Sequence, residues 1–141
     1  MRDKLSVLKE YFGHDSFREG QDRITDSLLG GRDVLGIMPT GAGKSICYQV
    51  PALMFDGITI VVSPLISLMK DQVSALVQSG VAAAYINSSL THAQYLKVLQ
   101  NTESGKYKII YVAPERLCAP AFLGICHNLN ISMVAVDEAH C

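Results

Sequence analysis

Two polar stretches near opposite ends of the chain have residue types suited to phosphate chemistry. The first is Met38-Pro-Thr-Gly-Ala-Gly-Lys-Ser45, which follows the apolar run Val34-Leu-Gly-Ile37 and precedes Ile46-Cys-Tyr-Gln-Val50. Strand, glycine loop and helix is the order that a phosphate-binding loop requires. Its glycines let backbone N–H groups converge on an anion, Lys44 adds a charge for the outer phosphates, and Ser45 offers a hydroxyl to Mg²⁺. The candidate nucleotide-binding residues are Thr40, Gly41, Ala42, Gly43, Lys44 and Ser45.

The loop departs from the usual pattern G-x-x-x-x-G-K-[ST] at one position. Met38 stands where the pattern has its first glycine, so the match rests on Gly41 and the final Gly43-Lys44-Ser45. From ordinary residue frequencies, such a tripeptide occurs by chance in roughly one chain in fifteen of this length. The loop therefore needs a second signal.

The second stretch supplies that signal. The apolar run Met133-Val-Ala-Val136 closes on Asp137-Glu-Ala-His140. In a P-loop ATPase, a carboxylate such as Asp137 holds Mg²⁺ through water and one such as Glu138 orients the attacking water. The alternative is a plain polar turn, but the partner loop favours ATP hydrolysis. Lys44, Asp137 and Glu138 are the candidate catalytic residues, and Ser45 and Asp137 the candidate magnesium ligands.

Composition bounds the protein class. The 141 residues are 49% hydrophobic and 18% charged, with a formal net charge of −1, which is typical of one globular domain. A free-standing nucleic-acid binder usually carries a basic surplus. Any nucleic-acid contact should therefore be local, made through backbone groups, or shared with another domain. Because no hydrophobic leader and no apolar run of membrane-spanning length is present, we expect a soluble intracellular protein without membrane contact.

The four cysteines form no C-x-x-C pair, and disulfides are not expected in an intracellular ATPase. Cys47 and Cys126 are interpreted as small buried apolar residues. His92 and His127 are expected on helix surfaces.

Apolar periodicity predicts alternating strands and helices. We expect an α/β fold, with a doubly wound, mainly parallel sheet between two helical layers. The expected strands are 34–37, 59–62, 82–86, 108–112 and 133–136, and the helices cover 5–12, the region around 24–29, 64–80, 91–100 and 119–129. The inward positions of two helices are predicted as Leu65, Leu68, Met69, Val73, Leu76 and Val77, and as Tyr95, Leu96 and Leu99.

Ligands of such sheets bind at the carboxyl ends of the strands. Five loops follow the predicted strands: the glycine loop and residues 63–64, 87–89, 113–116 and 137–140. We expect the nucleotide at the first and last, and a different ligand along the middle three.

Gln21 precedes the glycine loop. Its carboxamide has both a donor and an acceptor, so it can pair with the N6 and N7 edge of adenine. Spacing alone favours a solvated helix residue instead.

Five stretches of the chain occur in a distinctive order. They are Phe12-Gly13 with Phe17-Arg18 and Gln21, the glycine loop, Val61-Val-Ser-Pro-Leu-Ile-Ser-Leu-Met-Lys-Asp-Gln-Val73, Val112-Ala-Pro-Glu-Arg-Leu117, and Val136-Asp-Glu-Ala-His-Cys141. In that order they resemble the adenine-recognition motif, motif I, motif Ia, a DNA-contacting motif and motif II of the RecQ family of superfamily 2 DNA helicases, in its amino-terminal ATPase lobe. The similarity runs from about Leu8 to the last residue.

The resemblance implies a P-loop NTPase of RecA-like fold that unwinds DNA from 3′ to 5′ with ATP and Mg²⁺, in recombination and repair. Gln21 and Arg18 would contact adenine and His14 would stack on it, although tyrosine often stands at that position in the family. Contacts with single-stranded DNA or a duplex junction would involve Lys70, Asn87, Ser88 and Arg116, and His140 would couple nucleotide state to DNA. The expected location is the cytoplasm or nucleoid of a bacterium, or a eukaryotic nucleus.

The resemblance also implies a domain plan. Residues 1–30 would form a helical adenine-recognition segment and 31–141 a P-loop sheet domain, together one lobe truncated after motif II. A second lobe and a zinc-binding region are expected only outside this chain, so the chain alone should be inactive. Two alternatives stay open, namely an inert nucleotide-binding docking module and an RNA-dependent or remodelling ATPase. Lys70 and Arg116 can also be read as solvated surface charges.

Overall fold

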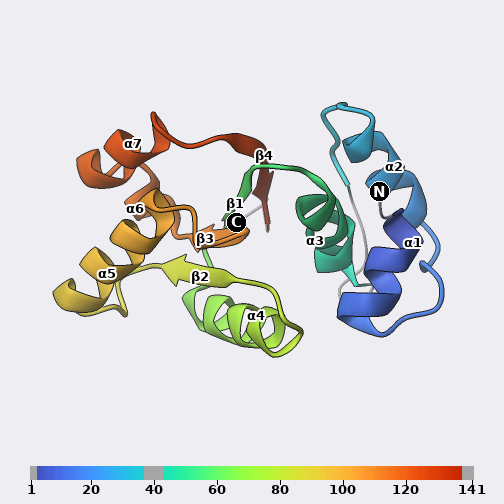
Figure 1. Ribbon diagram of the computed structural model, residues 1–141, viewed down its shortest axis with the longest axis horizontal. Helices are drawn as coiled ribbons and strands as arrows, with labels where there is room; N and C mark the ends of the chain where they lie inside the picture. Colours follow the sequence, from blue (N-terminus) through green and yellow to red (C-terminus); the bar gives the residue numbers. More distant parts are fainter. Residues whose placement is uncertain (1–2, 37–42, 138–141) are drawn as a thin grey trace. The chain divides into compact units, whose positions relative to one another are not determined.

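The computed structural model describes residues 3–36 and 43–137 of the chain, which group into two compact units, Met1–Asp56 and Gly57–Cys141. Thr40, Gly41 and Ala42 of the glycine loop, and Glu138 and His140 of the carboxyl end, lie outside the described residues. Figure 1 shows the helices and strands of both units.

The first unit is helical. Helix α1 (Lys4–Val7) begins at Asp3, whose side chain accepts the Ser6 backbone N–H at 2.7 Å; this bond lowers the pKa of the Asp3 carboxyl. The helix continues as a π-helical turn η1 (Leu8–Phe12), which ends at Gly13 with a φ of 72°. Helices α2 (Gln21–Leu29) and α3 (Lys44–Met54) follow. Val7, Leu8 and Val50 are buried at the centre of this unit.

The strand expected at 34–37, ahead of the glycine loop, is not formed over residues 34–36, the part of it that the structure describes. Residues 32–36 carry no strand and are all exposed, Leu35 to 83%. A strand needs a neighbour to satisfy its backbone groups, and none pairs with these residues in the described chain. The expectation of five strands is therefore wrong for the residues described, which form four.

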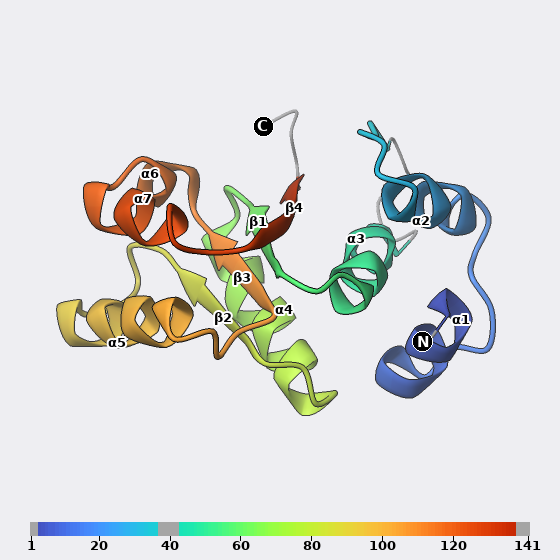
Figure 2. The same ribbon diagram turned by 45° about the horizontal axis from the view of Figure 1, so that its top comes forward.

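The second unit is built on a parallel sheet with the order β2-β3-β1-β4 (Figure 2). Its strands are β1 (Ile58–Val62), β2 (Ala83–Ile86), β3 (Ile109–Val112) and β4 (Ile131–Val136). Its helices are α4 (Ile66–Gln78), α5 (His92–Glu103), α6 (Pro114–Leu117) and α7 (Pro120–Cys126). Both faces of β1 are buried, as in a sheet covered on both sides.

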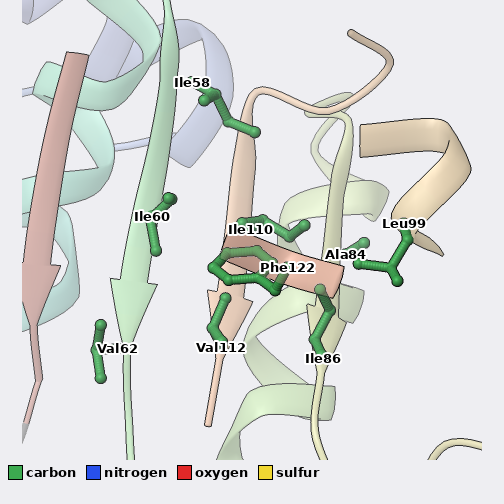
Figure 3. Packing of buried hydrophobic residues seen from close by; sticks show 9 residues of the cluster. All are labelled: Ile58, Ile60, Val62, Ala84, Ile86, Leu99, Ile110, Val112 and Phe122. Carbon is green, nitrogen blue, oxygen red and sulfur yellow. The ribbon is translucent and has the colours of Figure 1, made fainter. Parts of the chain in front are cut away.

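One face of this sheet packs on Phe122 of α7 and Leu99 of α5. Phe122 is completely buried among alternate side chains of three strands, namely Ile58, Ile60, Val62, Ile110, Val112, Ala84 and Ile86 (Figure 3). Helix α4 packs beside β2 and contributes Met69, Val73 and Leu76 to the interior. The parallel α/β architecture is thus confirmed.

Three apolar helix residues predicted to point inward are exposed instead. Leu68 and Val77 of α4 are 44% and 54% exposed, and Leu96 of α5 is 50% exposed. Each helix is covered along one stripe only, and these residues lie at its margin. The sequence pattern therefore predicted a wider apolar face on each helix than the face that is buried in the structure.

The cysteines and histidines lie largely as expected. Cys47 is buried and Cys126 half-buried, and burial raises the pKa of both thiols. Cys47, Cys118 and Cys126 form no disulfide in the described part of the chain. His92 and His127 are exposed, at the start of α5 and just after α7.

A buried hydroxyl in the central strand gives a stability prediction. Thr59 is completely buried, and its Oγ1 has no hydrogen-bond partner among the described residues. Thr59→Val removes this hydroxyl and keeps a β-branched side chain, so we expect stabilisation of about 1 kcal/mol. Urea unfolding should show a higher midpoint with an unchanged slope.

The same substitution at Thr102 is the control. Thr102 is equally buried, but its hydroxyl donates to the Val98 carbonyl at 2.7 Å. Thr102→Val should therefore destabilise the protein, because it removes a satisfied hydrogen bond. Equal shifts for the two variants would contradict the assignment of Thr59 as an unsatisfied group.

Candidate functional site

A pocket of about 350 Å³ lies within the first unit. It is lined by His14, Ser16, Arg18, Gln21, Gly43 and Ile46. These residues come from the segment between η1 and α2, from the first residue of α2, and from the start of α3. The pocket size is at the lower end of the range for small-molecule sites. The structure thus brings the three predicted adenine-contacting residues together with the last glycine of the phosphate loop.

Gln21 is the polar centre of this pocket. It is only 4% exposed, so it is not the solvated helix residue that spacing alone favoured. Its Oε1 accepts the Arg18 backbone N–H at 2.8 Å, and its Nε2 donates to the Gly43 carbonyl at 2.9 Å. The carboxamide therefore links two segments 22 residues apart in sequence. Adenine recognition through Gln21 would act directly on the end of the glycine loop.

Gly43 adopts a conformation that favours glycine. Its φ is +73°, in the left-handed region, and it is the N-cap of α3. A Cβ at this position would lie 2.5 Å from Gln21 Nε2. Gly43 is thus required both by its backbone angle and by the close approach of the glutamine.

Lys44 and Ser45 form the first turn of α3 and are half-buried. The first N–H groups of a helix have no partner within it, and the helix dipole is positive at this end. Lys44 carries a full positive charge in the same turn, so these residues offer an anion both charge and hydrogen bonds. The described part of the loop therefore has the chemistry of a phosphate site.

Lys4 connects α1 to α2 within the first unit. Its ammonium donates to the carboxylates of Asp22 and of Asp26, the latter at 2.6 Å, and lies 5.6 Å from the Phe17 ring centroid. Burial on its own lowers the pKa of Lys4, but the two carboxylates outweigh it and raise that pKa above the ordinary value. These contacts fasten the segment that carries Phe17 and Arg18.

The second unit places the loops that follow its strands at one edge of the sheet, while Lys70 lies within α4. Hydrogen bonds continue the strand ladder beyond the strand ends, with Ala113 N donating to Ile86 O at 2.9 Å and Ser63 N to Val112 O at 3.2 Å. On the far side of β1, Asp137 N donates to Val62 O at 2.8 Å. The loops after all four strands are therefore side by side, as expected for a parallel sheet.

The four candidate DNA-contacting residues differ in their exposure. Lys70 and Ser88 are exposed and Arg116 is half-buried. Asn87 is 1% exposed, so its side chain makes its contacts inside the protein. Its Nδ2 donates to Met69 Sδ at 3.3 Å, and its Oδ1 accepts the Ser89 N–H at 2.9 Å and the Ser89 hydroxyl at 2.5 Å. Asn87 therefore shapes the loop, whose exposed residues are Ser88 and Ser89.

The two candidate magnesium ligands belong to different units. The Ser45 hydroxyl lies at the start of α3 and the half-buried Asp137 directly after β4. Hydroxyl and carboxylate oxygens are hard donors of the kind that Mg²⁺ prefers, so the donor set fits this ion. Among the described residues, no group of three His, Cys, Asp or Glu side chains could hold a metal by itself.

Sequence reasoning missed three contributors. Ser16 and Ile46 line the pocket, and Lys4 joins α1 to α2. Proximity to the motifs could have suggested Ser16 and Ile46, whereas nothing in the sequence pairs Lys4 with residues 18 and 22 positions away.

A family model described as DEAD/DEAH box helicase matches residues 18–141. The chain is 51% identical over 137 residues to the ATP-dependent DNA helicase RecQ of Bacillus subtilis, covering 96% of this chain and 23% of that protein. The RecQ helicase of Pasteurella multocida is 50% identical, with 97% and 22% covered. The chain thus spans about a quarter of the length of these curated relatives. The resemblance predicted from the motifs is confirmed.

A crystal structure described as a hypothetical ATP-dependent RNA helicase from Sulfolobus tokodaii has the same fold. It matches 99% of this chain and 42% of its own, with a TM-score of 0.78 and 23% sequence identity. At that identity the match bears on architecture alone. Within the described residues, no helix is long and apolar enough to span a membrane.

Proposed function

Because the chain belongs to the DEAD/DEAH box helicase family, we propose that it is the ATP-binding lobe of a 3′ to 5′ DNA helicase of RecQ type acting in recombination and repair. Its identity of about 50% to RecQ helicases supports DNA as the polynucleotide. Such an enzyme would work where the genome lies, in a bacterial cytoplasm or nucleoid or in a eukaryotic nucleus.

The observation that carries the proposal is the contact between Gln21 and Gly43. A glutamine that bonds the carbonyl next to Lys44, in one pocket, supports base recognition beside phosphate binding. A site for ATP needs base recognition and phosphate binding next to each other, whereas a general phosphate site needs phosphate binding alone. Arg18 and His14 line the same pocket and would complete the adenine contacts.

The remaining nucleotide chemistry is assigned by residue type. Lys44 and the loop residues Thr40, Gly41, Ala42 and Gly43 would hold the phosphates, Ser45 and Asp137 would hold Mg²⁺, and Glu138 would orient the attacking water. The ion, when bound, neutralises charge that develops on the phosphate oxygens. His140 would pass the nucleotide state to the DNA side.

DNA would follow the carboxyl edge of the sheet in the second unit. Lys70, Ser88 and Arg116 would contact the strand directly, and Asn87 would hold the loop that presents Ser88. With a net charge of −1, the chain has little non-specific attraction to DNA. A second lobe would supply an arginine finger, which contributes about 10³ to 10⁵ in rate. Any zinc site would lie outside this chain.

A polynucleotide-stimulated ATPase assay tests the function. We expect the full-length protein to hydrolyse ATP faster with single-stranded DNA than with RNA, and the 141-residue chain to bind Mg-ATP with almost no turnover. Preferential stimulation by RNA would move the protein to an RNA-dependent class. If the full-length protein had no ATPase at all, the lobe would be a docking module, and strong DNA-stimulated turnover by the chain alone would refute the two-lobe argument.

Gln21→Ala tests base recognition. The variant loses a bidentate partner of adenine, so the preference for ATP over GTP should fall by roughly tenfold. Affinity for both nucleotides should fall further, because the bond to the Gly43 carbonyl is also lost. Calorimetric titration of each nucleotide measures both effects.

Gln78→Ala is the matched control. It removes the same side chain from the exposed last residue of α4 and should leave both affinities unchanged. An unaltered ATP-to-GTP ratio in Gln21→Ala would show that the glutamine serves the loop and not the base.

A further inference from the structure

Arg116, one of the residues proposed to contact DNA, meets a tyrosine of the second unit that has no role so far, Tyr95. Arg116, in α6, places its guanidinium carbon 5.2 Å from the ring centroid of Tyr95, in α5. Both residues are half-buried. We propose that Tyr95 is a positioning residue that holds Arg116 ready for a phosphate of the nucleic-acid strand. The inference rests on the proposed function, because it needs Arg116 to face a polynucleotide.

The contact with Tyr95 leaves the arginine able to bind. A guanidinium has five N–H donors in a planar group. The contact with the ring engages the positive charge of this group, and five donors are more than one ring face can take up. The donors that remain match two oxygens of a phosphate. In the described part of the chain, no carboxylate forms an ion pair with Arg116.

Tyr95 is held firmly enough to serve as a platform. Its ring packs against the core cluster around Phe122, and Leu117, the neighbour of Arg116, packs against the same cluster. Helix α5 begins with a capping box in which Thr91 and Gln94 exchange hydrogen bonds, and Tyr95 follows directly. The ring and the base of the arginine are therefore fixed by one core.

The arginine needs this support. Helix α6 has only four residues, and Arg116 lies in its last turn. A long side chain there would otherwise sample many rotamers, each of which must be given up on binding. Stacking on Tyr95 restricts those rotamers before DNA arrives, so less freedom is lost in the complex.

The pair is also correctly placed along the proposed DNA path. Helix α6 starts immediately after β3, where Ala113 N bonds Ile86 O at the carboxyl edge of the sheet. The loop that exposes Ser88 begins at the same point of β2. A strand lying along this edge would pass Ser88 and Arg116 in turn.

The test measures single-stranded DNA affinity of the full-length protein at several salt concentrations. Arg116→Ala should weaken binding and reduce the salt slope by about one. Tyr95→Leu should weaken binding by about two- to fivefold, with the slope unchanged because the charge remains. Tyr95→Phe keeps the aromatic face and should bind like the unaltered protein. In the double variant Tyr95→Leu/Arg116→Ala, the tyrosine change should add nothing.

Tyr107→Leu controls for a general loss of packing. Tyr107 packs against the same cluster, but its hydroxyl accepts from Asn101 Nδ2 at 3.1 Å and its ring does not support Arg116. This variant should lower stability and leave DNA affinity unchanged. Equal affinity losses for Tyr95→Phe and Tyr95→Leu, or additive losses in the double variant, would overturn the positioning role. An unchanged affinity in Arg116→Ala would instead remove Arg116 from the DNA path, and the inference with it, while ATP hydrolysis stimulated by DNA would still support the proposed function.

Discussion

Lys44→Ala should reduce ATP turnover by about a hundredfold or more while the protein stays folded. The side chain follows Gly43 in the first turn of α3, where it adds a full charge to the partial charge of the helix end. Its contact with a phosphate is worth roughly 1.5–3 kcal/mol in binding. It is worth more in the transition state, because negative charge grows on the transferred group.

Two further variants sharpen this test, which combines calorimetry of ATP binding with phosphate release by the full-length protein. Lys44→Arg keeps the charge but presents a planar fork in place of a compact ammonium, so it should also fail to restore turnover. Lys97→Ala removes an exposed lysine of α5 and should change neither quantity. Turnover at the unaltered rate in Lys44→Ala would remove the phosphate-loop assignment.

The second large effect is expected for Gly43→Ala. The added methyl group would lie 2.5 Å from Gln21 Nε2, and a φ of +73° is unfavourable for any residue with a Cβ. The backbone strain costs about 1–2 kcal/mol, and the collision also displaces the carboxamide from the Gly43 carbonyl. We expect ATP and GTP affinity to fall together by more than tenfold, and ATPase activity with them.

Gly80→Ala separates strain from collision. Gly80 has a φ of +92°, but a Cβ there meets nothing within 4 Å, so this variant should lose stability and keep nucleotide affinity. The double variant Gly43→Ala/Gln21→Ala removes the colliding amide and should recover part of the stability lost in Gly43→Ala. If Gly43→Ala bound nucleotide normally, the close approach of Gln21 to the loop would have no functional role.

Much of the fold could be predicted because it follows from local physics. The buried runs at 58–62 and 109–112 are rich in β-branched residues, which favour strands. Thr91 and Gln94 form a capping box, and Gly13 and Gly80 end their helices at positive φ. These signals act within a few residues of each other, so the sequence contains them completely. The sequence also predicts that the loops after the four strands lie at one edge of the sheet, because parallel strands have all their carboxyl ends on one side.

Side-chain partners could not be predicted, because they depend on residues far apart in sequence. Gln21 and Asn87 are both amides next to a motif, and composition treats them alike. The structure buries each against a different group, the Gly43 carbonyl for Gln21 and the Met69 sulfur for Asn87, which makes one a pocket residue and the other a loop support.

The sequence by itself therefore determined the chemical inventory of this protein and the order of its elements: a lysine and serine after a glycine loop, carboxylates after an apolar strand, and a parallel α/β sheet. Tertiary structure alone decided which groups Gln21, Asn87 and Arg116 contact, and left residues 32–36 without a strand. The reason is physical. Periodicity and propensity describe how a segment interacts with itself and with an average environment, whereas a hydrogen bond or a stacked cation needs one particular neighbour, which only the folded chain supplies.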